Sequence, residues 1–247
     1  MVVESSQPSS YRVPRIYAVL AMAGAVIGLV GNALHPHTVA DAATAVRTVA
    51  ERGSWVAIHL AIIVAILFVI GGLVGLAQLL EDGPGGPLAR LGLAAALLGG
   101  AAVTVSTAMD GFVMKALALA WASAPAGEAA TALGLAAGVK EIDFGIWSTG
   151  MLVFFGLTFV CFGAAICIGR QFPVWYGWMA IAGGGGSAGA ALLQIASTGQ
   201  VQAAETLFLA SSLLITFWAF ALGIFLWRAA RPARSPIAGQ ATASAYA

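Results

Sequence analysis

The sequence predicts an all-α integral membrane protein that forms a single bundle of six transmembrane helices. Three observations support this prediction. Of its 247 residues, 60% are apolar and only 9% are charged, whereas a soluble domain carries about 25% charged residues. Histidine aside, the ionisable residues leave six charge-free stretches of at least 19 residues, and a helix needs about 20 apolar residues to cross a bilayer. These stretches are continuously apolar rather than alternating, which favours helices over the strands of a barrel.

The six predicted spans follow one another in chain order. They cover residues 16–34, 55–80, 88–109, 144–168, 174–196 and 205–228. Together they form one membrane domain, residues 15–229. The flanking tails, residues 1–14 and 230–247, are rich in Ser, Pro, Ala and Gln and are predicted to be disordered.

The connections between the spans alternate between short and long. Those near residues 81–87 and 170–173 are short and contain Gly and Pro. In residues 35–54, Thr38 is followed three positions later by Asp41, which is typical of a capped helix start. We therefore expect a short amphipathic helix there, lying on the outer membrane surface. Residues 110–143 are Ala-rich, and we expect them to extend the third span in part and then to return over the outer face.

The distribution of Lys and Arg predicts that both termini are cytoplasmic. An even number of spans places the termini on one side, and that side carries seven of the 11 Lys and Arg residues. Because positive residues favour the cytoplasmic side, we expect a protein of the cell (inner) membrane, surrounded by lipid bilayer. The net charge of only +1 offers no basic surface for phosphates, which excludes nucleic acid as a partner.

Polar and ionisable side chains gather at the outer ends of the predicted spans. His59 lies one turn inside the second span, and Gln194 ends the fifth. Ionisable groups inside membrane segments usually face the bundle interior or an aqueous cavity. A carboxyl group beside an apolar cavity can act as an acid or a base on a lipophilic substrate. The candidate catalytic residues are His59, Asp110, Glu141, Asp143 and Glu205. Interfacial ion pairing with lysine is the alternative for these carboxylates.

The three histidines suggest a metal site. His35 and His37 flank Pro36, and proline favours extended backbone at the residue before it, which lets alternate side chains share a face. With His59 and Asp110 they offer three ring nitrogens and one carboxylate, a set that suits Zn²⁺ and equally accepts iron or copper. Interfacial histidines without a metal are the alternative. A haem held by His59 together with His35 or His37 is a further, less favoured alternative.

Four consecutive glycines, Gly183 to Gly186, interrupt the fifth span. Glycine costs a helix about 1 kcal/mol relative to alanine, so such a run needs a reason. Close helix packing is the favoured explanation, and on that basis we expect Gly185 to lie in a tight helix contact. A ligand lying against the backbone is the alternative.

The segment Asp41–Ala42–Ala43–Thr44–Ala45, together with Trp55 to His59, resembles a group of bacterial six-span membrane proteins without known activity. The resemblance covers about the first third of the chain and transfers no functional residue.

Three functions are compatible with this layout. The first is a small membrane enzyme whose outward-facing His/Asp/Glu site acts by acid/base or metal-assisted chemistry on a lipophilic small molecule. The second is a structural or accessory subunit, with a membrane-protein partner or a second copy of the chain against its Gly-rich faces. The third is a transporter. The inner halves of the spans argue against it, because they lack the polar groups that a polar path across the membrane would need.

Overall fold

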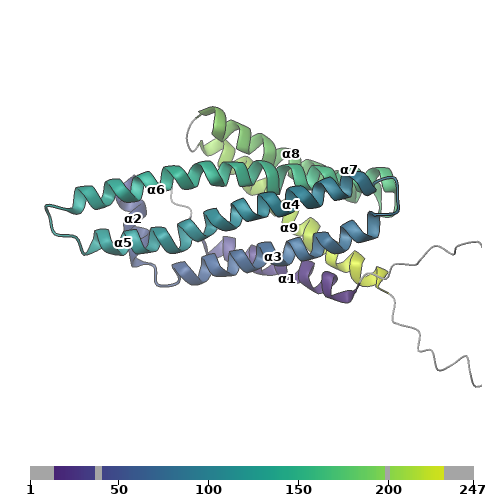
Figure 1. Ribbon diagram of the computed structural model, residues 1–247, viewed down its shortest axis with the longest axis horizontal. Helices are drawn as coiled ribbons and strands as arrows, with labels where there is room; N and C mark the ends of the chain where they lie inside the picture. The colour runs from purple at the N-terminus through teal and green to yellow at the C-terminus, as the bar shows by residue number, and fades with distance from the viewer. Residues whose placement is uncertain (1–13, 37–40, 198–200, 231–247) are drawn as a thin grey trace, which may run out of the picture.

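The computed structural model describes residues 14–36, 41–197 and 201–230, and within these ranges it is a bundle of helices (Figure 1). Six helical segments are long and apolar enough to cross a membrane, which confirms the predicted fold class. They are α1 (Arg15–Leu34), α3 (Trp55–Leu80), the continuous Gly86–Ala122, the continuous Ala129–Gly169, α8 (Val174–Ser197) and α9 (Gln202–Ala229). A short helix, α2 (Ala42–Glu51), lies between the first two spans.

The inner part of the bundle is held by apolar packing. In the described residues its core contains large, fully buried side chains from four helices, among them Leu73, Phe159, Tyr176 and Trp218. Tyr176 and Trp218 stack at 4.9 Å and exchange hydrogen bonds with each other's backbone carbonyls. Large apolar side chains such as Leu98 remain exposed on the outside, as expected where helices contact lipid. In the described part of the chain no Asp, Glu, Lys or Arg is fully buried.

The first and last spans meet at one end of the bundle. The guanidinium of Arg15, where α1 begins, lies 4.9 Å from the centre of the Trp227 ring near the end of α9. Both ends of the membrane domain therefore lie on one side of the bundle (Figure 1). That this side is cytoplasmic stays a prediction from the distribution of positive charge.

The third and fourth spans are much longer than the sequence predicted. The third runs through α4 (Gly86–Ala108), the π-helical η1 (Met109–Val113) and α5 (Met114–Ala122). The fourth runs through α6 (Ala129–Gly150), the π-helical η2 (Met151–Leu157) and α7 (Thr158–Gly169). At 1.5 Å per residue these helices of 37 and 41 residues reach roughly 55 and 60 Å, about twice the hydrocarbon thickness.

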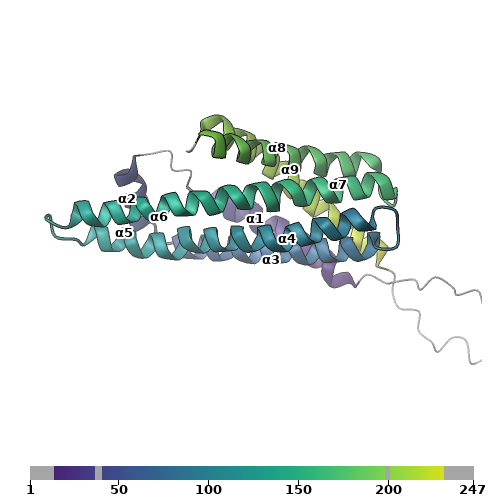
Figure 2. The same cartoon turned by 45° about the horizontal axis from the view of Figure 1, so that its top comes forward.

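The predicted return of residues 110–143 over the outer face is wrong. The chain turns only at residues 123–128 and comes back antiparallel, so α5 and the first half of α6 form a helical hairpin that extends beyond the other spans (Figures 1 and 2). The physical reason lies in the composition. Neither helix contains proline, and the Ala- and Leu-rich segments have high helix propensity up to the turn at Pro125 and Gly127.

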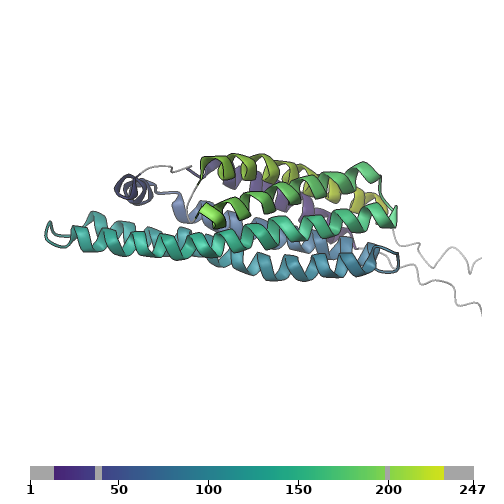
Figure 3. The same ribbon diagram turned by 90° about the horizontal axis from the view of Figure 1, so that it is seen from above.

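The predicted short helix exists, but it packs differently from the expectation. It is capped by Asp41, whose carboxylate accepts hydrogen bonds from the backbone N–H and hydroxyl of Thr44 at 3.0 and 2.7 Å. The backbone bond lowers the pKa of the Asp41 carboxyl. Thr38, the expected cap, lies outside the described residues. α2 lies beside the hairpin (Figure 3). Its apolar face is buried there rather than lying on the membrane surface, because Val46 and Val49 belong to one cluster with Met114, Ala118 and Ala136.

The glycine run packs helices, but not through the residue we expected. A Cβ on Gly184 would lie 2.8 Å from the carbonyl oxygen of Gly156 and from the nitrogen of Val160, both backbone atoms of the fourth span. A Cβ on Gly185 would meet nothing within 4 Å. The phase of the helix turns Gly185 outward, so the expectation that it lies in a tight contact is wrong.

This difference predicts opposite effects of two neighbouring substitutions. Gly184→Ala should lower the free energy of unfolding by about 1–3 kcal/mol, because backbone atoms cannot move aside for the new methyl group. Gly185→Ala should be neutral or stabilising, since alanine favours a helix and the site is open. Thermal unfolding in one detergent checks both, and equal destabilisation by the two changes would contradict the packing described here.

Candidate metal centre

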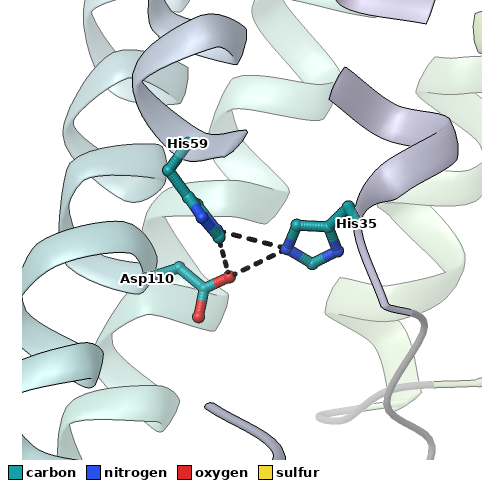
Figure 4. Close-up of side chains that lie close together, drawn as sticks. All are labelled: His35, His59 and Asp110. Carbon is teal, nitrogen blue, oxygen red and sulfur yellow. Dashed lines mark hydrogen bonds and ion pairs between the residues drawn. The ribbon is translucent and has the colours of Figure 1, made fainter. Parts of the chain in front are cut away.

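Three side chains from three elements converge (Figure 4), at the end of the bundle opposite to the start of α1 and the end of α9. His35 follows the last residue of α1, in the extended conformation that Pro36 favours. His59 lies on the second turn of α3, and Asp110 lies in the π-helical η1. They belong to three different membrane spans, so only the folded bundle brings them together.

The three side chains form a nearly equilateral triangle of polar atoms. His59 Nε2 lies 3.0 Å from Asp110 Oδ2 and 3.2 Å from His35 Nε2, and His35 Nε2 lies 3.4 Å from Asp110 Oδ2. The His59 side chain is only 2% exposed, whereas His35 and Asp110 are 25% and 31% exposed. The triangle is therefore closed behind His59 and accessible from the side of His35 and Asp110.

Trp55 fixes the orientation of both His59 and Asp110. His59 Nδ1 donates to the carbonyl oxygen of Trp55 at 2.8 Å. A neutral His59 ring therefore carries its proton on Nδ1 and presents the lone pair of Nε2 to the triangle. The indole Nε1 of the buried Trp55 donates to the carbonyl oxygen of Asp110 at 2.8 Å. Such outer partners are typical of metal-binding histidines, whose second nitrogen usually donates to a carbonyl or carboxylate.

The π-helical turn and Gly111 let His59 approach Asp110. π-Turns inside α-helices occur frequently at functional sites. A Cβ on Gly111 would overlap the Cβ of His59 and lie 2.7 Å from its Cγ. Glycine is therefore the residue that leaves room for the imidazole against η1.

Gly111→Ala is accordingly expected to displace His59 and weaken metal binding. An overpacked contact costs about 1–3 kcal/mol, and 1.4 kcal/mol corresponds to a tenfold change in affinity. We therefore expect a roughly tenfold loss of Co²⁺ affinity, measured by titration of the purified protein. Gly134→Ala is the matched control, because a Cβ there meets nothing within 4 Å. An unchanged affinity in Gly111→Ala would contradict this role.

The triangle has the dimensions of one face of a metal coordination sphere. Two ligand atoms bound at about 2.0–2.1 Å lie roughly 3.3–3.4 Å apart around a tetrahedral ion and roughly 2.9 Å apart around an octahedral one. The three distances, 3.0, 3.2 and 3.4 Å, fall in this range. The Nε2 lone pair of a neutral His59 and the carboxylate oxygen are both acceptors, so a shared cation would relieve their repulsion.

The same distances do not fit a haem. Two axial nitrogens on opposite sides of one iron stand about 4 Å apart, which is twice a metal–nitrogen bond, with the porphyrin between them. His35 Nε2 and His59 Nε2 are only 3.2 Å apart, and Asp110 Oδ2 lies within hydrogen-bond reach of both.

Two basic residues tie the connection between α2 and α3 to the centre. The ammonium of Lys115 donates to the carbonyl oxygens of Val49, Ala50 and Arg52 at 2.8, 2.8 and 3.0 Å, which closes the carboxyl end of α2. The Nη2 of Arg52 donates to the carbonyl oxygen of Leu34 at 2.8 Å, directly before His35 in the chain. The backbone N–H of Trp55 in turn donates to the Arg52 carbonyl oxygen.

The remaining predicted site residues have different surroundings. His37 lies outside the described residues. Asp143 is half-buried on α6 and accepts a hydrogen bond of 2.6 Å from Ser106, one turn before Asp110 on the third span. Glu141 is exposed on α6. Glu205 lies in the first turn of α9, where a negative charge favours the helix. Within the described residues, the cluster able to hold a metal contains His35, His59 and Asp110 but not these carboxylates.

Sequence reasoning missed the residues that orient the centre. Trp55 precedes His59 by four positions, which is the spacing at which a histidine reaches back to a helix carbonyl, so that signal was available. Gly111 and Arg52 gave none, because their importance depends on contacts between spans that are distant in the sequence.

Comparison with known proteins gives a family and no function. No curated protein and no solved structure matches the chain. Residues 13–228, which include all six spans and all three members of the triangle, match one protein family. The chain therefore belongs to the family described as a domain of unknown function, DUF4386.

Proposed function

We propose that this protein is a metal-dependent enzyme of the cell (inner) membrane, in which His35, His59 and Asp110 bind one divalent transition-metal ion. The observation that carries the proposal is the triangle of two imidazole nitrogens and one carboxylate oxygen with sides of 3.0–3.4 Å. Its orientation by Trp55 supports the proposal further, because metal-ligating histidines are usually held in this way.

Three protein ligands leave at least one coordination position open. Catalytic zinc sites keep such a position for water or substrate, and two histidines with one carboxylate also form the facial triad of non-haem iron enzymes. A metal ion there would act as a Lewis acid or lower the pKa of a bound water. The donor set favours zinc, iron or a similar ion over Ca²⁺ or Mg²⁺, which prefer oxygen ligands throughout.

The position of the centre favours a lipophilic substrate. The triangle lies where α1 ends and α3 begins, so it is close to the level at which the hydrocarbon meets the head groups. Its accessible side is that of His35 and Asp110. A molecule with an apolar body can reach this level from within the bilayer and present a polar group to the ion.

The distribution of buried polar side chains disfavours a transporter. A transport path needs polar groups through the whole thickness of the membrane. In the described residues, the buried His, Ser, Thr and Gln side chains lie at the level of the triangle or near the middle of the spans, and none lies at the end near the chain termini, where Leu76 and Leu222 are fully buried. An accessory subunit needs no metal, so metal binding separates it from the enzyme.

The proposal is tested by loading the purified protein. The chain, stripped with chelator and titrated with Zn²⁺ or Co²⁺ in a neutral detergent, should bind one equivalent with micromolar or tighter affinity. Four-coordinate Co²⁺ would show intense visible absorption bands. Asp110→Asn keeps the size of the side chain, removes its charge and should weaken binding at least tenfold, whereas Asp82→Asn, on the opposite side of the membrane domain, should not. Failure to bind either ion would overturn the proposal and favour the accessory subunit.

A further inference from the structure

Arg52 carries a charge that the described residues do not neutralise. Arginine keeps its charge at every physiological pH, and buried arginines are normally paired. In the described part of the chain no carboxylate lies within ion-pair distance of Arg52, and the two close pairs of a carboxylate with a basic side chain join Asp110 to His35 and to His59. The Nε of Arg52 is buried and has no hydrogen-bond partner there. Arg52 as a whole is half-buried, and its buried Nε–H costs free energy unless another group supplies an acceptor.

Stabilisation of the carboxyl end of α2 does not explain the position of Arg52. A cation after α2 would favour the helix dipole, but Lys115 already satisfies the carbonyl oxygens of Val49 and Ala50. The guanidinium of Arg52 instead reaches across to the carbonyl oxygen of Leu34 on α1. That bond uses Nη2 and leaves the Nε–H without an acceptor in the described residues.

Arg52 adjoins the metal centre on two sides. Leu34, which it contacts, precedes His35 in the chain. Trp55, whose backbone N–H donates to the Arg52 carbonyl oxygen, has its ring 5.2 Å from the His35 ring and 4.8 Å from the His59 ring between centroids. A divalent ion bound by two neutral histidines and one carboxylate would add a net positive charge to that of Arg52. Both charges attract an anion to this end of the bundle.

We propose that Arg52 binds the phosphate or carboxylate head group of an anionic amphiphile whose polar end reaches the open coordination position of the metal ion. The inference rests on the proposed function and names its substrate class. Guanidinium pairs with phosphate and carboxylate through two parallel hydrogen bonds. The level of the centre suits such a ligand, because its tail can stay in the hydrocarbon while its head group lies at the interface.

The test compares three probes of equal chain length on the Co²⁺-loaded protein. Dodecyl phosphate is the anion, dodecanol the neutral analogue and dodecyltrimethylammonium the cation. In neutral detergent, dodecyl phosphate should bind at least about tenfold more tightly than dodecanol, as hydrogen bonds to charged groups predict. It should also change the visible absorption of the bound Co²⁺, because its head group lies at the ion. The trimethylammonium probe should bind more weakly than dodecanol.

Arg52→Gln should remove the preference for phosphate and the change in the Co²⁺ spectrum. Glutamine keeps a donor for the Leu34 carbonyl oxygen, so the variant should still load Co²⁺, and the preference is measured on the loaded protein as the ratio of its affinities for dodecyl phosphate and dodecanol. Arg47→Gln is the matched control, because Arg47 is exposed on the same short helix, and it should behave as the wild type. Arg52→Lys keeps the charge and should retain a preference for phosphate. If Arg52→Gln fails to fold, a folded Arg52→Lys without that preference overturns the inference.

Other outcomes separate this inference from the proposed function. A phosphate preference that survives Arg52→Gln would overturn the inference. Binding of dodecyl phosphate without any change in the Co²⁺ spectrum would also overturn it, since the head group would then occupy an ordinary lipid site away from the ion. If the wild type binds no Co²⁺, the proposed function fails. Calorimetry on the metal-free protein then still tests Arg52, and a preference for phosphate lost in Arg52→Gln would support an anion site without a metal.

Discussion

Replacing His59 with alanine is expected to lower the affinity for Zn²⁺ or Co²⁺ by at least about 100-fold, because three protein ligands become two. His59 is the most buried member of the triangle, and its Nε2 lies within 3.2 Å of both other ligand atoms. The change also removes the imidazole hydrogen bond to the carbonyl oxygen of Trp55 and the packing of a buried ring, which should cost about 1–3 kcal/mol of folding stability. Isothermal titration in detergent measures the first effect and thermal unfolding the second.

Gln194→Ala separates the loss of a ligand from the loss of a buried polar group. Gln194 is 4% exposed and contacts Ser148 between α6 and α8, in a different part of the bundle. Its replacement should destabilise the fold by a similar amount and leave metal affinity unchanged. A His59→Ala protein that binds metal as the wild type does would remove this residue from the centre.

Trp55→Phe is expected to weaken metal binding by roughly 10–100-fold without removing any ligand, which is the usual cost of losing an outer partner. Phenylalanine keeps the backbone carbonyl that receives the His59 proton but loses the indole N–H that holds the Asp110 carbonyl. The π-helical turn that carries Asp110 would then be free to rearrange. Titration with Co²⁺ measures the affinity, and the change in its visible spectrum reports altered geometry.

Trp121→Phe provides the control for this change. Trp121 packs in the cluster between α2 and the hairpin, and it is only partly buried there. It should lose some packing free energy and no metal affinity. Equal affinity in Trp55→Phe and the wild type would show that the indole bond only supports the fold.

The spans could be predicted because charge avoidance in a membrane is a strong and local signal. The start of α3 at Trp55 and its end at Leu80 match the predicted limits. The hairpin could not be predicted in the same way, since the Ala-rich residues 110–143 contain charges yet still favour a helix. Charge therefore marked the edge of the apolar stretch but not the end of the helix.

The triangle could be predicted in part from depth along the spans. His35, His59 and Asp110 all fall near those ends of their segments that lie opposite to the chain termini, and this shared level together with donor chemistry was enough to group them. The other contacts depend on which face of its helix each residue occupies. Nothing in the run of four glycines favours Gly184 over Gly185 for the tight contact. The sequence equally offered no sign that Arg52 would reach Leu34 across 18 residues, because that contact exists only once α1 and α3 have packed.

X-ray absorption spectroscopy of the purified, metal-loaded protein tests the central claim most directly. With zinc or cobalt bound, the spectrum should show only nitrogen and oxygen neighbours at about 2.0–2.1 Å, with the outer-shell scattering of two imidazole rings. In His35→Ala that imidazole scattering should fall by half. A stoichiometric ion with sulfur neighbours, or one whose imidazole scattering is unchanged in His35→Ala, would place the metal elsewhere and contradict the assignment of His35, His59 and Asp110 as its ligands.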